Sequence, residues 1–184
     1  MNHIIFATGN TRKIIEATST LEPLGITIEP RTIAIDEIQH HDPAEITKAK
    51  ARAAYEVIHK PVVVQDTNWS IPALGGFPGG YMKDVAEWFA PEDWLTLMAR
   101  HEDRTIYCHE HVVYFDGEHL EHFSHTYTGT FALEARGTTG NSIEKTACLY
   151  DDMTLSEMFS AKGVASAGEV LEHWKLFGEW YAEA

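Results

Sequence analysis

Residues 3–13 read His3-Ile4-Ile5-Phe6-Ala7-Thr8-Gly9-Asn10-Thr11-Arg12-Lys13, and this stretch decides the fold class. The short apolar run His3–Ala7 is typical of a buried strand, and the Thr8-Gly9-Asn10 segment is typical of a turn. From Arg12 to Leu21 the apolar residues recur at helical spacing, so a helix follows the turn. A strand, a glycine turn and a helix in this order open a protein that mixes both kinds of element.

A second strand and a second helix are predicted next along the chain. Alternating apolar residues over 26–33 indicate a strand. Asp42 can cap a helix, Pro43 suits its first position, and Glu45 stands where the acid of a capping box reaches back. This helix is expected to run to about His59.

The region after this helix combines a buried strand with a loop and a long helix. Val62-Val63-Val64 predicts a fully buried strand that ends in the polar group Gln65-Asp66-Thr67-Asn68. A loop rich in glycine and proline over 75–80 then leads into a helical pattern from Tyr81 to Arg100.

The middle of the chain is rich in β-branched and aromatic residues. Two predicted strands over 104–115 and 120–133 flank Asp116-Gly117, a hairpin signal. Capping boxes at 154–157 and 166–169 indicate two later helices, the second reaching Tyr181. We therefore predict one domain over 1–184 of mixed α/β class. It has a central mixed sheet flanked by helices and a β-rich second lobe over about 104–150.

Composition narrows the class of protein and its partners. The 184 residues carry 14 Lys and Arg against 28 Asp and Glu, a net charge of −14, which opposes binding to a nucleic acid polymer. A small anion such as a nucleotide needs only a few local cations. No apolar run approaches a membrane span and no signal-peptide pattern is visible, so we expect a cytoplasmic protein. Cys108 and Cys148 form no CxxC motif.

Two sets of polar residues are candidates for chemistry. The turn at 8–10 precedes a helix N-terminus and two cations, an arrangement that suits an anion, although an ordinary strand-to-helix turn has the same pattern. Asp66 follows a buried strand and Glu37 lies in a loop between a strand and a helix. Two such carboxylates make a Mg²⁺ site when phosphates complete the shell. The alternative for Asp66 is a capping or turn residue.

Histidines and aromatic residues are assigned to other roles. His109 and His111 share a face of a predicted strand, and His119, His122 and His125 are close in sequence, but no zinc spacing appears. No GxSxG motif supports a serine nucleophile. Aromatic residues at 87–89 and 173–181 have helical spacing, which favours core or subunit packing.

Four segments in the first half of the chain together resemble the inosine triphosphate pyrophosphatase family. They are Ala7-Thr8-Gly9-Asn10-Thr11-Arg12-Lys13, Lys50-Ala51-Arg52-Ala53-Ala54, Pro61-Val62-Val63-Val64-Gln65-Asp66-Thr67, and Ala73-Leu74-Gly75-Gly76-Phe77-Pro78-Gly79 with Tyr81 and Lys83. The resemblance implies a homodimeric hydrolase that converts a nucleoside triphosphate, such as ITP, dITP or XTP, into the monophosphate and pyrophosphate.

The resemblance also implies roles for individual residues. Glu37 would hold Mg²⁺, with Mn²⁺ as an alternative, and Asp66 would orient or deprotonate the attacking water and contact the metal. Three lysines would neutralise the triphosphate together with the backbone amides of the opening turn, and Lys162 would supply a late cation. The residues expected to bind substrate are thus Thr8, Gly9, Asn10, Lys13, Lys50, Lys83 and Lys162.

Three departures from the family concern metal binding and recognition of the nucleotide base. Gln65 stands where the family usually has an acid, immediately before Asp66. The segment that grips the purine is replaced by residues 140–145, and the usual Ser-His-Arg reads Ser166-Ala167-Gly168. We therefore expect altered or relaxed base selection. Two alternatives stay open: a pyrophosphatase for a pyrimidine or modified nucleotide, and a catalytically silent nucleotide-binding regulator.

Overall fold

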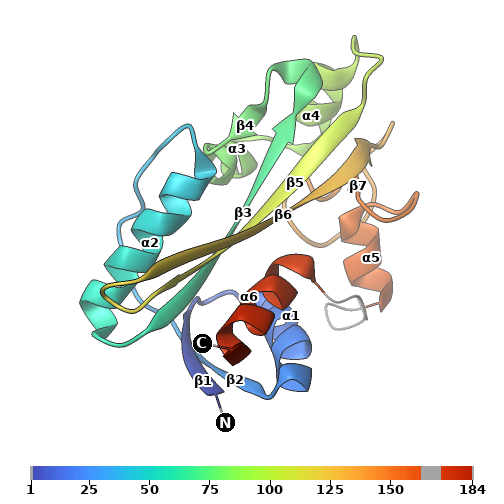
Figure 1. The fold of residues 1–184 in the computed structure, drawn as a ribbon. Helices are drawn as coiled ribbons and strands as arrows, with labels where there is room; N and C mark the ends of the chain where they lie inside the picture. Colours follow the sequence, from blue (N-terminus) through green and yellow to red (C-terminus); the bar gives the residue numbers. More distant parts are fainter. Residues whose placement is uncertain (1, 163–170, 184) are drawn as a thin grey trace. The chain divides into compact units, whose positions relative to one another are not determined.

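The computed structural model describes residues 2–162 and 171–183, with only the backbone of Lys162. Figure 1 shows how helices and strands mix along the chain. The strands are β1 (Asn2–Ala7), β2 (Ile26–Arg31), β3 (Val62–Ile71), β4 (Phe77–Gly79), β5 (Thr105–Phe115), β6 (Leu120–Phe131) and β7 (Ala147–Cys148). The helices are α1 (Thr11–Leu21), α2 (Pro43–Ile58), α3 (Met82–Trp88), α4 (Pro91–Met98), α5 (Leu155–Lys162) and α6 (Glu172–Glu183).

The sheet is mixed, as the sequence predicts. Its strand order is β2-β1-β3-β5-β6-β7, with β4 paired to β3. Strand β1 is parallel to β2 and β3, whereas β4 and β7 are antiparallel to β3 and β6. The predicted α/β class is therefore confirmed.

The described residues divide into two compact units. Unit 1 comprises 2–67, 110–125 and 171–183, and unit 2 comprises 68–109 and 126–162. Three strands, β3, β5 and β6, contribute one part to each unit. Among the described residues no helix has the length and apolar character needed to span a membrane.

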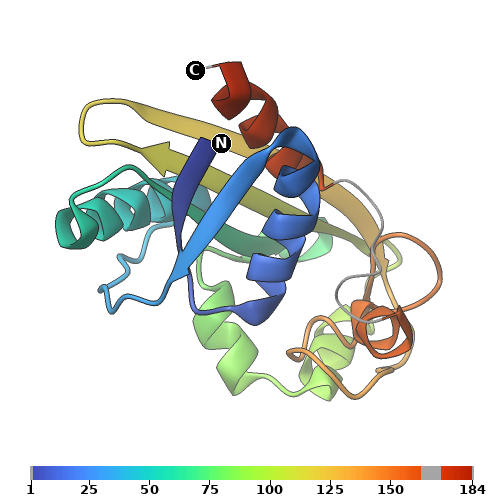
Figure 2. The same cartoon turned by 90° about the horizontal axis from the view of Figure 1, so that it is seen from below.

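In unit 1 alternate residues of β1 pack into two different cores. Ile4 and Phe6 join residues of α1 and α6, whereas Ile5 and Ala7 join Ala51 of α2 and its neighbours. This period of two follows from strand geometry, and it explains why β1 is apolar from Ile4 to Ala7. Figures 1 and 2 show α1 and α6 side by side in unit 1. Trp174 and Phe177 of α6 are fully buried, which confirms core packing for that aromatic segment.

Helix α2 begins where the sequence predicts but is capped differently. The Asp42 side chain accepts a hydrogen bond from the backbone N–H of Ala44, which confirms the cap. The Asp42 backbone N–H donates to His40 Nδ1, while Glu45 binds Lys48. The predicted capping box at Glu45 is therefore wrong, because a neighbouring histidine and lysine take the two groups.

The hairpin of β5 and β6 is confirmed at its turn. Asp116 Oδ1 accepts hydrogen bonds from the backbone N–H groups of Glu118 and His119. Gly117 has a φ of 106°, and a Cβ there would collide with the Tyr55 ring, so this position requires glycine.

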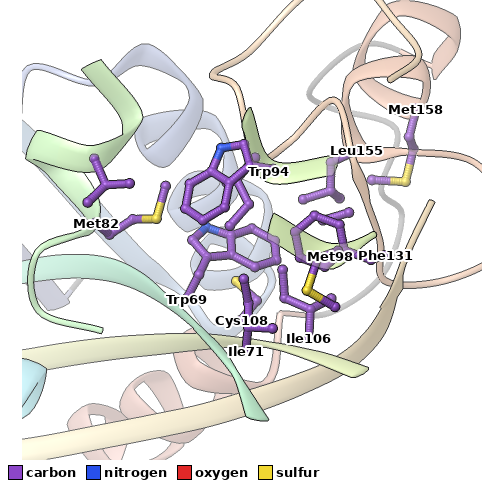
Figure 3. Packing of buried hydrophobic residues seen from close by; sticks show 13 residues of the cluster. Trp69, Ile71, Met82, Trp94, Met98, Ile106, Cys108, Phe131, Leu155 and Met158 are labelled. Atoms are coloured by element: carbon purple, nitrogen blue, oxygen red, sulfur yellow. The ribbon is translucent and has the colours of Figure 1, made fainter. Parts of the chain in front are cut away.

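Unit 2 has its own core, built around two tryptophans. Figure 3 shows Trp69 and Trp94 in the middle of a cluster to which strands and helices of the unit contribute. The Trp94 indole N–H donates to Ser142 Oγ at 2.9 Å, so its polar group is satisfied in the interior. Trp88 is 73% exposed on α3, so of the two packing roles predicted for that aromatic segment, core and subunit contact, the core role is wrong for Trp88.

Two predicted boundaries are wrong for identifiable reasons. The predicted helix over 81–100 is two helices, because Pro91 disfavours a helical conformation at Ala90, which has a ψ of 161°. The strand predicted to stop at Val64 continues to Ile71, so its polar residues lie within β3. Pairing with β4, in the segment predicted as a loop, supports this extension.

Candidate active site

The candidate site of unit 1 lies beyond the carboxyl ends of β1 and β2, beside residues 65–67 in the middle of the parallel strand β3. Ala7 at the end of β1 pairs with Arg31 at the end of β2, and Phe6 pairs with Val63 of β3. Three segments continue beyond this edge, namely residues 8–13, the loop that contains Glu37, and 65–67 of β3. Ligands of open α/β sheets bind at such an edge.

The opening turn is held by its own hydrogen bonds. The Thr8 backbone N–H donates to Arg31 O at 3.0 Å, and the Asn10 backbone N–H donates to Thr8 Oγ1 at 3.1 Å. Asn10 Oδ1 caps α1 by accepting from the backbone N–H groups of Arg12 and Lys13. The side chains of Thr8 and Asn10 are thus engaged in hydrogen bonds that shape the turn. Contact of these two residues with substrate remains a prediction.

Gly9 allows a close approach in the same turn. A Cβ at Gly9 would stand 3.2 Å from Thr32 Cγ2 and 3.2 Å from Thr32 Oγ1. The segment that follows β2 therefore packs tightly against the turn, and a larger side chain would push the two apart.

Asp66 and Lys50 meet because β3 alternates. Val62, Val64 and Asp66 share one strand face, and the two valines pack in the core to which α2 contributes. Lys50 of α2 extends its ammonium to 3.9 Å from Asp66 Oδ1 and 2.7 Å from Glu37 Oε1. Three of the residues predicted from the sequence are thus brought together.

Lys13 of α1 reaches the same carboxylate. Its Nζ lies 3.9 Å from Asp66 Oδ1 and donates to the Gln65 backbone carbonyl at 3.2 Å. The site thus contains two ammonium groups beside one aspartate, with one glutamate on the second ammonium. All four side chains are only partly exposed, between 12% and 30%.

The two lysines have opposite pKa shifts. Burial lowers the pKa of Lys13, and the nearby charges of Asp66 and Glu110 offset part of that effect. Burial also acts to lower the pKa of Lys50, but Asp66 and the hydrogen bond to Glu37 outweigh it, so the pKa of Lys50 is raised. Lys50 is therefore held as a cation by the carboxylates around it.

A third acid, Glu110 of β5, lies on the opposite face of β3. Glu110 Oε2 accepts from Gln65 Nε2 at 2.9 Å and from Thr67 Oγ1 at 2.8 Å. Gln65 Nε2 also lies 3.2 Å from Nε2 of His173, a buried residue of α6. Burial lowers the pKa of His173, which favours the neutral ring.

Sequence reasoning missed Glu110, although one signal was present. Cys108 and Val112, two positions away on either side, are buried, so alternation places Glu110 on a core-facing side of β5. An acid on such a face is seldom buried without a partner. Its hydrogen-bond partners, Gln65 and Thr67, are distant in sequence and could not be identified from it.

The remaining predicted residues fall elsewhere. Lys83 is exposed at the second position of α3, in unit 2, so its role toward the unit 1 residues stays a prediction. The Lys162 side chain and residues 166–168 lie outside the described part of the chain, as does the second predicted capping box. Residues 140–145 form a turn in which Asn141 and Glu144 bind each other's backbone N–H groups.

The histidines of the hairpin bind separate partners. His109 contacts Ser70 Oγ at 2.7 Å and Thr126 Oγ1 at 2.9 Å, whereas His111 Nδ1 lies 2.9 Å from His122 Nε2. His109 and His111 therefore have different surroundings, in unit 2 and unit 1 respectively.

The carboxylates of Glu37 and Asp66 suit a hard cation that binds together with phosphate groups. Among residues 2–162 and 171–183 no group of three or more His, Cys, Asp or Glu side chains is placed to hold a metal ion. Glu37 and Asp66 nevertheless both pair with the Lys50 ammonium. Mg²⁺ commonly takes one or two carboxylates and completes its shell with water and substrate phosphates, so these residues fit Mg²⁺ bound together with a nucleotide.

Comparison with known proteins gives a consistent result. Residues 4–163 match the model of the Ham1 family. The chain is 31% identical to the dITP/XTP pyrophosphatase of Methanopyrus kandleri, over 97% of this chain and 95% of that protein. It is 31% identical to the dITP/XTP pyrophosphatase of Hyperthermus butylicus, over 74% of this chain and 72% of that protein.

The fold has a counterpart among solved structures. A HAM1 protein from Coxiella burnetii aligns with a TM-score of 0.79 at 20% identity, covering 100% of both chains. At 20% identity this similarity concerns the fold alone. The similarity in sequence is to the two pyrophosphatases named above.

Proposed function

The chain belongs to the Ham1 family, and from that premise we propose that it is a nucleoside triphosphate pyrophosphatase. The observation that carries the proposal is the convergence of Lys13 and Lys50 on Asp66, with Glu37 on Lys50. A triphosphate needs concentrated positive charge, and a chain of net charge −14 must supply that charge locally. Hydrolysis also needs activation of the reacting water, which a carboxylate such as Asp66 can supply as a general base.

The reaction assigns complementary roles to these side chains. Water attacks the α-phosphorus, the bond from that phosphorus to the bridging oxygen breaks, and pyrophosphate leaves. Asp66 accepts the proton of the water, while Lys13 and Lys50 stabilise the negative charge on the phosphates. Phosphoryl transfer depends mainly on positioning and charge neutralisation, which these residues can supply without a covalent intermediate.

Magnesium completes the proposal. Glu37 and Asp66 would hold the ion, and Mn²⁺ would be accepted because it prefers the same oxygen ligands. The ion supplies additional positive charge to the phosphates when it is bound. Lys50, which now pairs with both carboxylates, would then be available to the substrate.

The preferred substrates are proposed to be deaminated purine nucleotides with relaxed base selection. Two relatives are named dITP/XTP pyrophosphatases. Relaxation is proposed from the sequence, because Ala167 and Gly168 have no side chains that could hydrogen bond to a base. A homodimer is also proposed, and the exposed Trp88 and Tyr81 of unit 2 suit a subunit contact. Sedimentation equilibrium of the purified chain would test the dimer.

The function is tested by measuring which phosphate product is released. We expect pyrophosphate, and not orthophosphate, from a panel of ITP, XTP, dITP, GTP, ATP and pyrimidine triphosphates, with activity lost in EDTA and restored by Mg²⁺ or Mn²⁺. Glu37→Gln should raise the Mg²⁺ concentration needed for half-maximal activity by about tenfold or more. The matched control Glu45→Gln, whose carboxylate binds Lys48, should leave it unchanged.

Three results would contradict the proposal. Nucleotide binding without any product would favour the silent regulator. Orthophosphate release would indicate a different bond cleavage. Restoration by Zn²⁺ alone, lost on changing His109 and His111, would move the metal site to the hairpin.

A further inference from the structure

Glu110 contacts both residues that flank Asp66 in β3. Its Oε2 accepts from Gln65 Nε2 at 2.9 Å and from Thr67 Oγ1 at 2.8 Å. Because side chains alternate along a strand, Gln65 and Thr67 project to one face and Asp66 to the other. One carboxylate therefore fixes the backbone on either side of the residue to which we assign the water.

The same contact extends to Lys13. Gln65 donates its side-chain amide to Glu110, and its backbone carbonyl accepts the Lys13 ammonium at 3.2 Å. The negative charge of Glu110 also acts to raise the pKa of Lys13, which favours the charged ammonium. Displacing Gln65 would thus move both the aspartate and one of the two cations.

The Glu110 carboxylate determines the orientation of the Gln65 side-chain amide. A carboxylate can only accept, so the NH₂ group of Gln65 must face Glu110. The second amide proton then points at His173 Nε2, 3.2 Å away, which requires the neutral ring with its proton on Nδ1. Gln65 is 2% exposed, and within the described chain its Oε1 has no hydrogen-bond partner. A buried carbonyl oxygen in this state is unfavourable, so stability alone does not account for the arrangement.

Resting on the proposed function, we infer that Glu110 is a positioning residue of the pyrophosphatase site, and that the contact of residues 65 and 110 requires one carboxylate and one amide. Glu110 acts through its hydrogen bonds with Gln65 and Thr67, the two neighbours of Asp66. The Gln and Glu side chains are equally long, so either one can reach across the contact from position 65 or from position 110. The carboxylate can therefore be transferred from one strand to the other.

A charge exchange tests this role. Glu110→Gln leaves two amides in the contact, and Gln65→Glu alone places two carboxylates there. The combined variant Gln65→Glu with Glu110→Gln restores one of each in transposed positions. Displacement of a reacting group by about 1 Å can cost about 10²-fold, so we expect each single variant to lose about 10- to 100-fold in kcat with KM changed less than about threefold. We expect the combined variant to recover most of that loss.

Controls separate positioning from folding. Glu121→Gln removes an exposed carboxylate from the neighbouring strand β6 and should retain wild-type kcat. Thr67→Val removes one hydrogen bond to Glu110 without changing charge and should lower kcat in the same direction, which keeps the test valid if a charge variant fails to fold. Thermal unfolding of each variant identifies that failure.

The outcomes distinguish this inference from the proposed function. Wild-type kcat in Glu110→Gln and Thr67→Val would overturn the positioning role while leaving the pyrophosphatase proposal intact. Losses that simply multiply in the combined variant would also overturn it, because the contact would then have no preference for one carboxylate. A wild-type protein that releases no pyrophosphate would overturn the proposed function, and this role with it.

Discussion

The surroundings of Asp66 differ between the two faces of β3. Two ammonium groups lie 3.9 Å from the same oxygen, Oδ1, and they come from α1 and α2, which flank different cores of unit 1. Its backbone neighbours are tied to Glu110 on the other face of the strand. The carboxylate is thus held by charge on one side and by backbone anchoring on the other.

Replacement of this carboxylate should affect turnover more than binding. Asp66→Asn keeps the size of the side chain but removes the proton acceptor, so we expect kcat to fall by about 10²-fold or more. At saturating Mg²⁺, where a weakened metal site does not limit binding, the affinity for a nonhydrolysable α,β-imido nucleotide should change little, since both lysines remain. Steady-state pyrophosphate release and equilibrium binding measure the two effects.

Asp36→Asn is the control for this change, because Asp36 is exposed and lies beside Glu37 in the loop. Near wild-type turnover by Asp66→Asn would remove Asp66 from the reaction.

Lys50 and Lys48 provide a matched pair on one helix. Lys50 contacts Glu37 and Asp66, whereas Lys48 contacts Glu45 in a surface pair of the kind that contributes little. Lys50→Gln should lower kcat/KM by about 10²-fold, because a preorganised positive charge is lost from the phosphate site. Lys48→Gln should stay within about twofold of wild type. Equal effects of the two changes would show that general surface charge, and not the site, attracts the substrate.

At the scale of elements, sequence patterns succeeded where the signal is local. The Asp42 cap, the Asp116 turn and the start of α1 after Asn10 each depend on residues within three positions. The break between α3 and α4 was also encoded locally, by Pro91, but the periodicity on both sides obscured it. The extension of β3 to Ile71 was not encoded locally, because the polar residues 65–68 are compatible with a strand only when neighbouring strands pair with them.

The candidate site divides in the same way. Lys13, Lys50, Glu37 and Asp66 were identified through their types and the family resemblance, and the structure brings them together. The Glu110 network joins residues separated by 45 and 108 positions. No spacing rule relates such residues, so only the folded chain reveals them.

The start of α5 provides a test at the scale of an element. Thr154 Oγ1 accepts from the Glu157 backbone N–H at 3.2 Å, and Glu157 Oε2 accepts from the Thr154 backbone N–H at 2.9 Å, which confirms the predicted capping box. Thr154→Ala should lower the free energy of unfolding by about 1 kcal/mol. For a chain of this length the midpoint Tm should fall by about 2–4 °C, measured by calorimetry. Thr138→Ala, at an exposed position, should have no effect.

Acidic pH should weaken the same cap. Hydrogen bonds from Thr154 and the contact with Arg136 lower the pKa of Glu157. A lowered folded pKa gives stability that is complete above the unfolded value and is lost as the pH falls through the folded value. The Tm difference between wild type and Glu157→Gln should therefore narrow below about pH 4. A difference that is constant from neutral to acidic pH would contradict the cap as a charged interaction.

At the scale of the whole molecule, the distribution of charge matters more than its sum. A net charge of −14 repels polyanions in general, yet two lysines are placed with carboxylates at one sheet edge in unit 1. Paired in this way, the lysines do not present a basic surface to nucleic acids. A small anion that enters with its own divalent cation can exchange partners with these pairs, which favours a metal-bound nucleotide over a polymer.

Selectivity among nucleotides is the property for which we predict the largest departure from the family. A pocket whose side chains hydrogen bond to the base rejects an analogue lacking those groups by about 10⁴-fold, since buried partners would be left unpaired. Ala167 and Gly168, which lie outside the described residues, cannot supply such bonds from their side chains. We therefore expect kcat/KM for ITP or XTP to exceed that for GTP by less than about 10³-fold.

Introducing hydrogen-bonding side chains should restore discrimination. The double variant Ala167→His with Gly168→Arg should shift kcat/KM toward ITP and XTP relative to GTP, ATP and the pyrimidine triphosphates, because both new side chains can donate to a base oxygen. Thr138→His, at an exposed position of unit 2, is the control for a histidine that merely adds a titratable group. A wild-type preference above about 10³-fold would mean that other residues already recognise the base, and relaxed selection would be wrong.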